Sequence, residues 1–317
     1  KIGKRKTVII SLIITSAAMV LPICAYNYPV LIVSFCLLGI GNTLMQVSLN
    51  PLVNCIVTGD KLASTLTFGQ FVKAIASFIA PIIASLAAAK FGNWLLLFPF
   101  FLVFSIVATV YLSLTEIKEP AVKVESLSFF KCIKLLGDSS VLLFFLGIVC
   151  HVGIDVGVNT CAPKIIMERF ALPLEKAAFA TSIYFLFRTI GCFAGSFILA
   201  KFPLKKFIAV SVACMVLSMA GLFLCHTLTG LYVAIALVGF GNSNIFSMIF
   251  SSALLYKPEN DNEMSGLMIM GLIGGTIFPL LMGILSDAFA SQTGSVVVIT
   301  AGVAYLIFLA ARFLKKA

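Results

Sequence analysis

Charged residues are scarce in this sequence, with 11% of its 317 residues charged against 61% hydrophobic. A water-soluble fold of this size cannot bury so much apolar surface, so most of its surface has to face lipid. The formal net charge of +10 does not indicate a nucleic-acid partner, because the basic residues lie at the ends of apolar runs and not on one continuous face. The composition therefore predicts a membrane protein.

Sequence patterns of metal sites and of catalysis are also lacking. The nine cysteines are an odd number and include no Cys-x-x-Cys pair, so neither a disulfide framework nor a zinc site is indicated. The sequence contains no His-Glu-x-x-His pattern, no glycine-rich phosphate loop and no recognisable Ser/His/Asp set. We therefore expect no enzyme activity and no metal or organic cofactor.

Long apolar runs dominate the chain instead. A bilayer core of roughly 30 Å needs about 20 apolar residues per helix. The runs of this length cover residues 7–26, 29–53, 62–88, 92–115, 140–163, 176–200, 206–226, 229–255, 264–288 and 295–313. They predict an all-α membrane protein with four transmembrane helices in residues 1–115, a connector at 116–139 and six transmembrane helices in residues 140–317.

Lys and Arg are distributed unevenly between the two sides of these helices. One set of loops holds most of them, whereas the other set holds only Lys90, Lys164, Arg169 and Lys176. Loops rich in Lys and Arg stay in the cytoplasm. This rule places the first residues, the connector and the C-terminus on the cytoplasmic side.

One segment, Gly39-Ile40-Gly41-Asn42, returns two hundred residues later as Gly239-Phe240-Gly241-Asn242. Such a repeat predicts two similar lobes with a path between them. The same alignment sets the basic segment 1–6 opposite 201–206, and the second half has two further helices before that segment. We therefore expect two helices to precede Lys1 in a whole protein of six plus six helices.

Six plus six helices, with a long cytoplasmic connector and a basic loop after the second helix of each half, resemble the major facilitator superfamily. Lys1-Ile2-Gly3-Lys4-Arg5-Lys6 is similar to the end of its Asp-Arg-x-Gly-Arg-Arg loop. Gln46-Val47-Ser48-Leu49-Asn50-Pro51 resembles the Gln/Glu-x-x-x-Asn-Pro motif of its fucose, galactose and glucose permease branch. Further segments resemble the seventh, eighth and eleventh helices of that branch: 152–163, Tyr184-Phe185 with Arg188 and Gly191, and Gly274-Gly275 with Pro279, Gly283 and Asp287.

This resemblance implies two pseudo-symmetric six-helix lobes that hold a monosaccharide between them and move it by alternating access with proton symport. It also implies a monomer in the bacterial cytoplasmic (inner) membrane, with a sugar as its small-molecule partner and the proton as coupling ion. At Gln46 the chain is similar to the glucose/galactose members, since the fucose-type members have a glutamate there. Lys73 stands where the family usually has Asn. In this respect the chain departs from the usual hexose-binding pocket of the family.

Three charged residues lie deep in the apolar runs: Lys73, Asp155 and Arg188. Each costs about 2.5–3.5 kcal/mol at a helix centre, so each should face a partner or a water-filled cavity. We expect Lys73 and Arg188 to bind substrate and Asp155 to carry the proton. The alternative is a fixed ion pair of Asp155 with Arg188 or Lys73 that only holds helices together.

Neutral polar side chains in or near the spans are the remaining candidates for substrate binding: Gln46, Asn50, Gln70 and Asn159. Their amides offer the donors and acceptors that sugar hydroxyls need, but amides also join helices to one another. His151 could relay protons, although packing is its more common role, and we expect packing for Asn42 and Asn242.

Other functions stay open beside the sugar symporter. Two cations against one anion inside the membrane favour a carrier for another small, possibly anionic, organic solute. A receptor that binds a solute without moving it is a further alternative.

Overall fold

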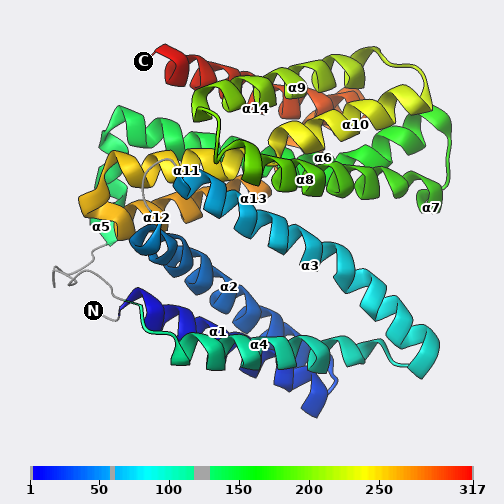
Figure 1. Ribbon diagram of the computed structural model, residues 1–317. Coiled ribbons are helices and arrows are strands. Elements are labelled where there is room, and N and C mark those ends of the chain that lie inside the picture. Colours follow the sequence, from blue (N-terminus) through cyan, green and yellow to red (C-terminus); the bar gives the residue numbers. More distant parts are fainter. Residues whose placement is uncertain (1–2, 58–60, 118–128, 316–317) are drawn as a thin grey trace.

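The structure is a computed structural model that describes residues 3–57, 61–117 and 129–315 (Figure 1). All regular secondary structure in these residues is helical. Nine segments of the described chain are long and apolar enough to cross a membrane. The predicted all-α class is therefore confirmed, while residues 118–128 of the predicted connector lie outside the described part.

The first four apolar runs form four long helices: α1 (Lys4–Cys24), α2 (Tyr28–Ile56), α3 (Lys61–Phe91) and α4 (Leu97–Leu114). The helix α3 has 31 residues, or about 46 Å at 1.5 Å per residue. It is therefore long enough to cross a bilayer, as predicted for the third run.

The rest of the chain forms a second group of helices. They are α5 (Phe129–Lys134), α6 (Ser139–Phe170), α7 (Leu174–Ala177), α8 (Phe179–Ile198), α9 (Leu204–Leu224), α10 (Leu228–Asn242), α11 (Ile245–Tyr256), α12 (Asp261–Met270), α13 (Gly274–Phe289) and α14 (Thr293–Lys315).

The predicted spans 229–255 and 264–288 each correspond to one segment long enough to cross a membrane, but the helix within each segment is interrupted. The run 229–255 breaks at Ser243 and Asn244, between α10 and α11. The run 264–288 contains a 3₁₀ turn before α13, where a Cβ on Gly274 would lie 2.0 Å from the carbonyl oxygen of Val149 on α6. Broken helices are tolerated at membrane depth only where protein neighbours cover the backbone, which an apolar run cannot reveal.

The predicted repeat corresponds to two equivalent helix pairs, α1–α2 and α9–α10. The Ser34 hydroxyl donates to the carbonyl of Ala18 at 2.7 Å in the first pair. The Ser218 hydroxyl donates to the carbonyl of Ala234 at 2.6 Å in the second. These residues occupy equivalent positions with donor and acceptor exchanged, so both pairs bring their helices together at the same place.

The two pairs also begin and pack alike. Asn27 caps α2 by accepting from the backbone of Val30, and Thr227 caps α10 in the same way. A Cβ on Gly241 would lie 2.6 Å from the Ser211 carbonyl oxygen, so glycine is needed for this close approach of α9 and α10.

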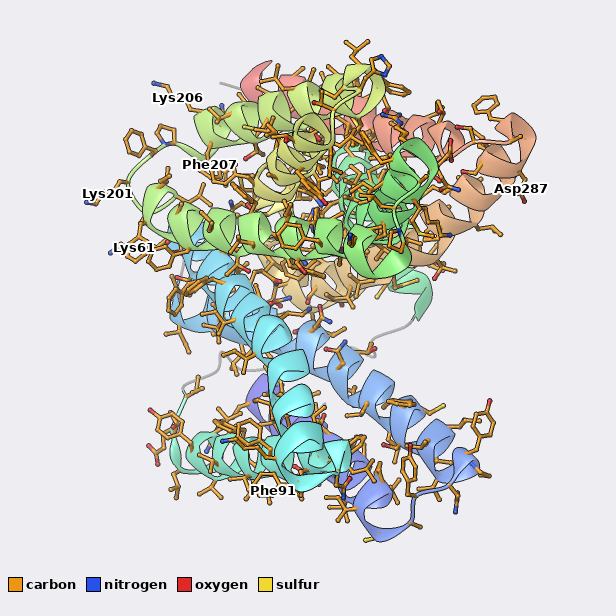
Figure 2. The ribbon with its side chains drawn as sticks, turned by 90° about the vertical axis from the view of Figure 1, so that its right-hand side faces the viewer. Lys61, Phe91, Lys201, Lys206, Phe207 and Asp287 are labelled. Carbon is orange, nitrogen blue, oxygen red and sulfur yellow. The ribbon has the colours of Figure 1, made fainter. Side chains whose placement is uncertain are left out.

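The two groups of helices meet at one end of the molecule and diverge towards the other (Figure 1). Figure 2 shows α2 and α3 reaching from the lower group towards the upper one. Contacts between the groups include Lys4–Asp261 at 2.5 Å, Ser265–Val47 at 2.9 Å, Ser64–Ser196 at 2.5 Å and the rings of Phe71 and Phe193 at 5.0 Å. They lie towards the end that carries the basic loops, and the two groups of helices diverge towards the opposite end (Figure 1).

Candidate functional site

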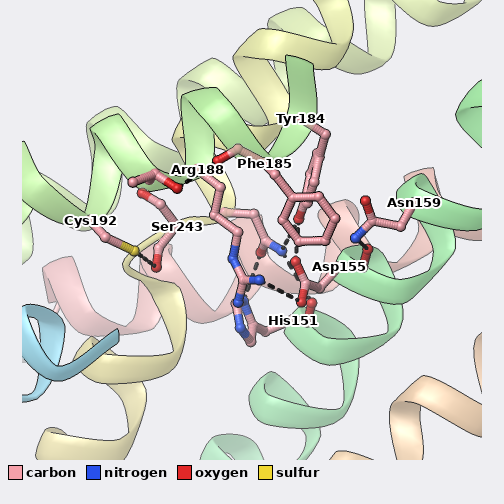
Figure 3. A network of polar contacts seen from close by, with 10 residues as sticks. His151, Asp155, Asn159, Tyr184, Phe185, Arg188, Cys192 and Ser243 are labelled. Atoms are coloured by element: carbon pink, nitrogen blue, oxygen red, sulfur yellow. Dashed lines mark hydrogen bonds and ion pairs between the residues drawn. The ribbon is translucent and has the colours of Figure 1, made fainter. Parts of the chain in front are cut away.

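An ion pair lies at the middle of two long helices. Arg188 Nη1 on α8 lies 3.2 Å from Asp155 Oδ2 on α6 (Figure 3). Arg188 lies about 14 Å along the helix from Phe179, and Asp155 about 24 Å from Ser139, at 1.5 Å per residue. Their side chains are only 21% and 18% exposed. The charges therefore lie near the centre of the predicted spans.

Tyr184 gives the same carboxylate a second partner. Its hydroxyl donates a hydrogen bond to Asp155 Oδ1, and its side chain is fully buried. Tyr184 precedes Arg188 by one helical turn, so both side chains project from one face of α8. Each oxygen of Asp155 is thus engaged by a donor from α8.

A second layer of hydrogen bonds joins α6 to α10. Asn242 Oδ1 lies 2.8 Å from His151 Nδ1, and Asn242 Nδ2 donates to the His151 carbonyl at 3.2 Å. The same amide nitrogen lies 3.5 Å from the hydroxyl oxygen of Tyr184. Because the amide oxygen accepts, His151 Nδ1 carries the proton in this arrangement. Together with the ion pair, these residues make up what we call the polar cluster: His151, Asp155, Tyr184, Arg188 and Asn242.

Glycine allows α10 to lie directly against α8 beside the cluster. A Cβ on Gly239 would lie 2.6 Å from the Tyr184 carbonyl oxygen and 3.4 Å from the Arg188 nitrogen. A Cβ on Gly191 would meet the Ser243 hydroxyl at 2.4 Å. Any larger side chain would separate the helices and move Tyr184 and Arg188 away from their partners.

Polar groups at the break between α10 and α11 form hydrogen bonds with α8. The Cys192 thiol donates to the Ser243 carbonyl at 3.3 Å, and the Asn244 amide donates to the Gly191 carbonyl at 2.9 Å. The break therefore lies about one turn along α8 from Arg188, next to the cluster. Broken helices of this kind border the solute sites of many transporters.

Lys73 brings a further positive charge from the other group of helices. It lies on α3, close enough for its charge to interact with those of Arg188 and Asp155. Two cations and one anion leave this region with a net charge of +1. The charged side chains of the site therefore come from both groups of helices.

Two polar atoms at the site still lack a hydrogen bond. Arg188 Nε is a buried donor and Asn159 Oδ1 a buried acceptor, and neither has a partner among the described residues. The other end of the Asn159 amide donates to the Asp155 carbonyl at 2.9 Å. Buried polar atoms in this state require a hydrogen-bond partner from water or solute. A bound molecule at this site can therefore accept a hydrogen bond from Arg188 Nε and donate one to Asn159 Oδ1.

The structure thus brings together four of the seven residues expected at the site: Lys73, Asp155, Asn159 and Arg188. The other three are Gln46, Asn50 and Gln70. Gln46 donates to Asn42 at 3.2 Å within α2, and Asn50 is buried. In the described part of the chain, no hydrogen bond or ion pair links these three residues to the cluster.

Sequence reasoning missed Tyr184 as a site residue and gave His151 and Asn242 mainly packing roles. The available signal was spacing, because His151 lies one turn before Asp155 and Tyr184 one turn before Arg188. Polar side chains repeated at i and i+4 inside an apolar run mark a polar face. The Asp155–Arg188 ion pair, on which the alternative of a purely structural pair rests, is present in the structure.

Comparison with known proteins places this geometry in a family. Residues 1–271 match the model of the Major Facilitator Superfamily. A glucose/galactose transporter of Brucella abortus is 25% identical over 309 residues, covering 91% of this chain and 73% of that protein. A putative glucose/galactose transporter of Helicobacter pylori is 25% identical over 311 residues, covering 90% and 74%.

The same fold occurs in a solved structure. The crystal structure of the Major Facilitator Superfamily transporter FucP in the outward conformation matches with a TM-score of 0.85 at 19% identity, covering 99% of this chain and 83% of that one. The family match covers most of the chain, and the fold agrees with it. The chain belongs to the Major Facilitator Superfamily.

Proposed function

We propose that this protein is a secondary active transporter that moves a monosaccharide of the fucose, galactose or glucose type by alternating access, with proton symport. The proposal rests on the polar cluster near the centre of the predicted spans and on two atoms beside it, Arg188 Nε and Asn159 Oδ1, that lack a hydrogen-bond partner among the described residues. A sugar hydroxyl both donates and accepts, so sugar hydroxyls suit these two atoms. Relatives named as glucose/galactose transporters support the same solute class.

We assign solute binding to six polar side chains: Gln46, Asn50, Gln70, Lys73, Asn159 and Arg188. Amides and cations at these positions offer donors to the ring and hydroxyl oxygens of a sugar. Lys73 and Arg188 come from opposite groups of helices, so a solute held by both favours their approach.

Proton coupling is assigned to Asp155. In its ionised form, the carboxylate holds Arg188 and accepts from Tyr184. A proton on Asp155 would cancel the charge attraction and release the guanidinium towards the solute. Proton binding and solute binding would then favour each other, which is the requirement for symport. No metal or organic cofactor is needed in this scheme.

Alternating access requires that the contacts at the basic end separate when the opposite end closes. The Lys4–Asp261 pair is one of these contacts. We assign the basic end to the cytoplasm of a bacterial cell, with the protein in the inner membrane and its C-terminus cytoplasmic. We divide the chain into an N-terminal lobe in residues 1–115, a connector at 116–139 and a C-terminal lobe in residues 140–317, and expect a monomer.

A second candidate is a carrier for a small organic anion. The observation that favours it is the net charge of +1 from Lys73, Arg188 and Asp155 at the site. A carboxylate would pair with Lys73 or Arg188 more strongly than a hydroxyl does.

Counterflow in proteoliposomes separates the two candidates. Vesicles are loaded in turn with fucose, galactose, glucose and a panel of organic acids, and exchange of the labelled solute is followed together with internal pH. Saturable sugar exchange supports the proposed solute class, and acidification of the vesicle interior during net uptake of the sugar supports proton symport. Exchange of an acid without exchange of any sugar would reject the sugar assignment. The Asp287→Asn variant, changed at an exposed position on α13, serves as a matched control for Asp155→Asn.

A further inference from the structure

A basic cleft lies away from the polar cluster, between the start of α6, the start of α9 and the end of α14. It has a volume of about 140 Å³, which holds several water-sized groups. Its polar lining consists of Lys205, Arg312 and the two serines Ser139 and Ser140. Three helices thus contribute polar groups to one small space at the basic end of the molecule.

The charge of this cleft is positive. Lys205 and Arg312 line it, and none of its lining residues is acidic. The nearest acid in sequence, Asp138, is already engaged, since its Oδ2 lies 2.8 Å from Lys257 Nζ. The same carboxylate also accepts from the Ser140 backbone at 2.9 Å. Within residues 3–57, 61–117 and 129–315, neither Lys205 nor Arg312 forms an ion pair, so both cations remain available to an anion from outside.

The remaining walls of the cleft are apolar. Leu143 and Leu309 line it below the charges. The guanidinium of Arg312 lies 5.3 Å from the ring centroid of Phe308, one turn nearer the membrane centre. Phe308 is 46% exposed, so an apolar surface leads from the cations towards the lipid-facing side of α14. Free phosphate would contact only the polar part of the cleft and not this apolar surface.

We propose that this cleft binds the phosphate of an anionic glycerophospholipid from the cytoplasmic leaflet, with an acyl chain along Phe308. Arg and Lys are the side chains that bind phosphate most strongly, and serine hydroxyls add donors. Basic pockets between transmembrane helices on this side of a membrane suit lipid headgroups. The site is separate from the transport site and does not depend on the transported solute.

Lipid binding to the purified protein tests this proposal. Native mass spectrometry in detergent would measure the affinity for phosphatidylglycerol, phosphatidylcholine and inorganic phosphate. The variants are Lys205→Gln, Arg312→Gln and their double. A basic residue near an anionic membrane surface contributes about 1 kcal/mol, so each single variant should lose about fivefold in phosphatidylglycerol affinity and the double about 25-fold.

Lys206 offers a matched control, because it is the next residue along α9 and points away from the helices (Figure 2). Lys206→Gln should bind phosphatidylglycerol as the wild type does. Equal affinity for phosphatidylcholine and phosphatidylglycerol would overturn the proposal. An unchanged affinity of the double variant for phosphatidylglycerol would also overturn it. Displacement of phosphatidylglycerol by an equal concentration of inorganic phosphate would overturn it too, because the cleft would then be a site for free anions.

Discussion

Replacing Asp155 by Asn is expected to destabilise the protein by about 3–5 kcal/mol, because it leaves the Arg188 guanidinium buried without its counter-charge. At 3.2 Å and an effective dielectric constant of about 20, the attraction between the two charges is about 5 kcal/mol. The Asn oxygen can still accept from Tyr184, so the substitution removes the charge and keeps that hydrogen bond. The loss therefore measures the cost of leaving the Arg188 guanidinium buried without its counter-charge.

The reverse substitution should cost less. In Arg188→Gln the carboxylate of Asp155 is left alone, but a carboxylate can neutralise itself by binding a proton, whereas a guanidinium cannot lose its proton. The double variant Asp155→Asn/Arg188→Gln has no buried charge at this pair and should lie within about 1–2 kcal/mol of the wild type. The two substitutions are therefore expected to be strongly non-additive.

The assay is equilibrium unfolding in mixed micelles, followed by far-ultraviolet circular dichroism, for the wild type, both single variants and the double. Asp287→Asn provides the control, since it removes an exposed carboxylate of α13 and should change the free energy of unfolding little. Additive losses in the double variant would refute the reasoning. A wild-type stability in Asp155→Asn would refute it equally.

Three further predictions concern the surroundings of the ion pair and the start of α6. Tyr184→Phe should cost about 1.5–3 kcal/mol of unfolding free energy, because it removes a hydrogen bond to a charged group; unchanged stability in the same micelle assay would contradict this. Gly239→Ala should lose about 1–3 kcal/mol in that assay, since its Cβ would lie 2.6 Å from a carbonyl oxygen of α8. In the equivalent Gly39→Ala, the Cβ has no described atom within 4 Å beyond its own stretch of helix, so this variant should lose almost nothing, and equal losses would reject the explanation. The hydrogen bond from Lys257 holds the pKa of Asp138 below its usual value, so the stabilisation is present above about pH 4 and is lost as the pH falls below it. Thermal unfolding between pH 3 and pH 6 should show this loss in the wild type, and Lys257→Gln should flatten it.

The sequence was sufficient to locate the long helices and to give their order along the chain. Apolar runs of membrane length have few other structures available. The repeat also identified equivalent helix pairs, since α1–α2 and α9–α10 share their caps and their crossing contacts. These features follow from local chemistry, which the sequence carries directly.

The partners of polar residues could not be predicted in the same way. Asn42 and Asn242 occupy equivalent positions of the repeat, yet Asn42 accepts from Gln46 on its own helix while Asn242 is buried against His151 of α6. Their difference depends on which helix lies alongside, and the repeat does not specify that. Tyr184 was missed for the same reason, because a tyrosine in an apolar run is recognised as polar only when its partner is known.

Charged residues inside the membrane were the more reliable signal. The cost of burying Asp155 or Arg188 alone is so high that a partner or a cavity was expected for each, and the structure supplies the partner. Neutral amides such as Gln70 carry a smaller cost and are satisfied in more ways. Their assignment to the solute path stays a prediction.

The most direct test of the account compares proton-driven accumulation with counterflow of labelled galactose in proteoliposomes, for the wild type and Asp155→Asn. Counterflow needs only solute binding and alternating access, whereas accumulation also needs the coupled proton. The wild type should perform both, and Asp155→Asn should retain counterflow while losing accumulation. Accumulation that persists in Asp155→Asn at the wild-type level would contradict the account, because the proton would then travel by another route.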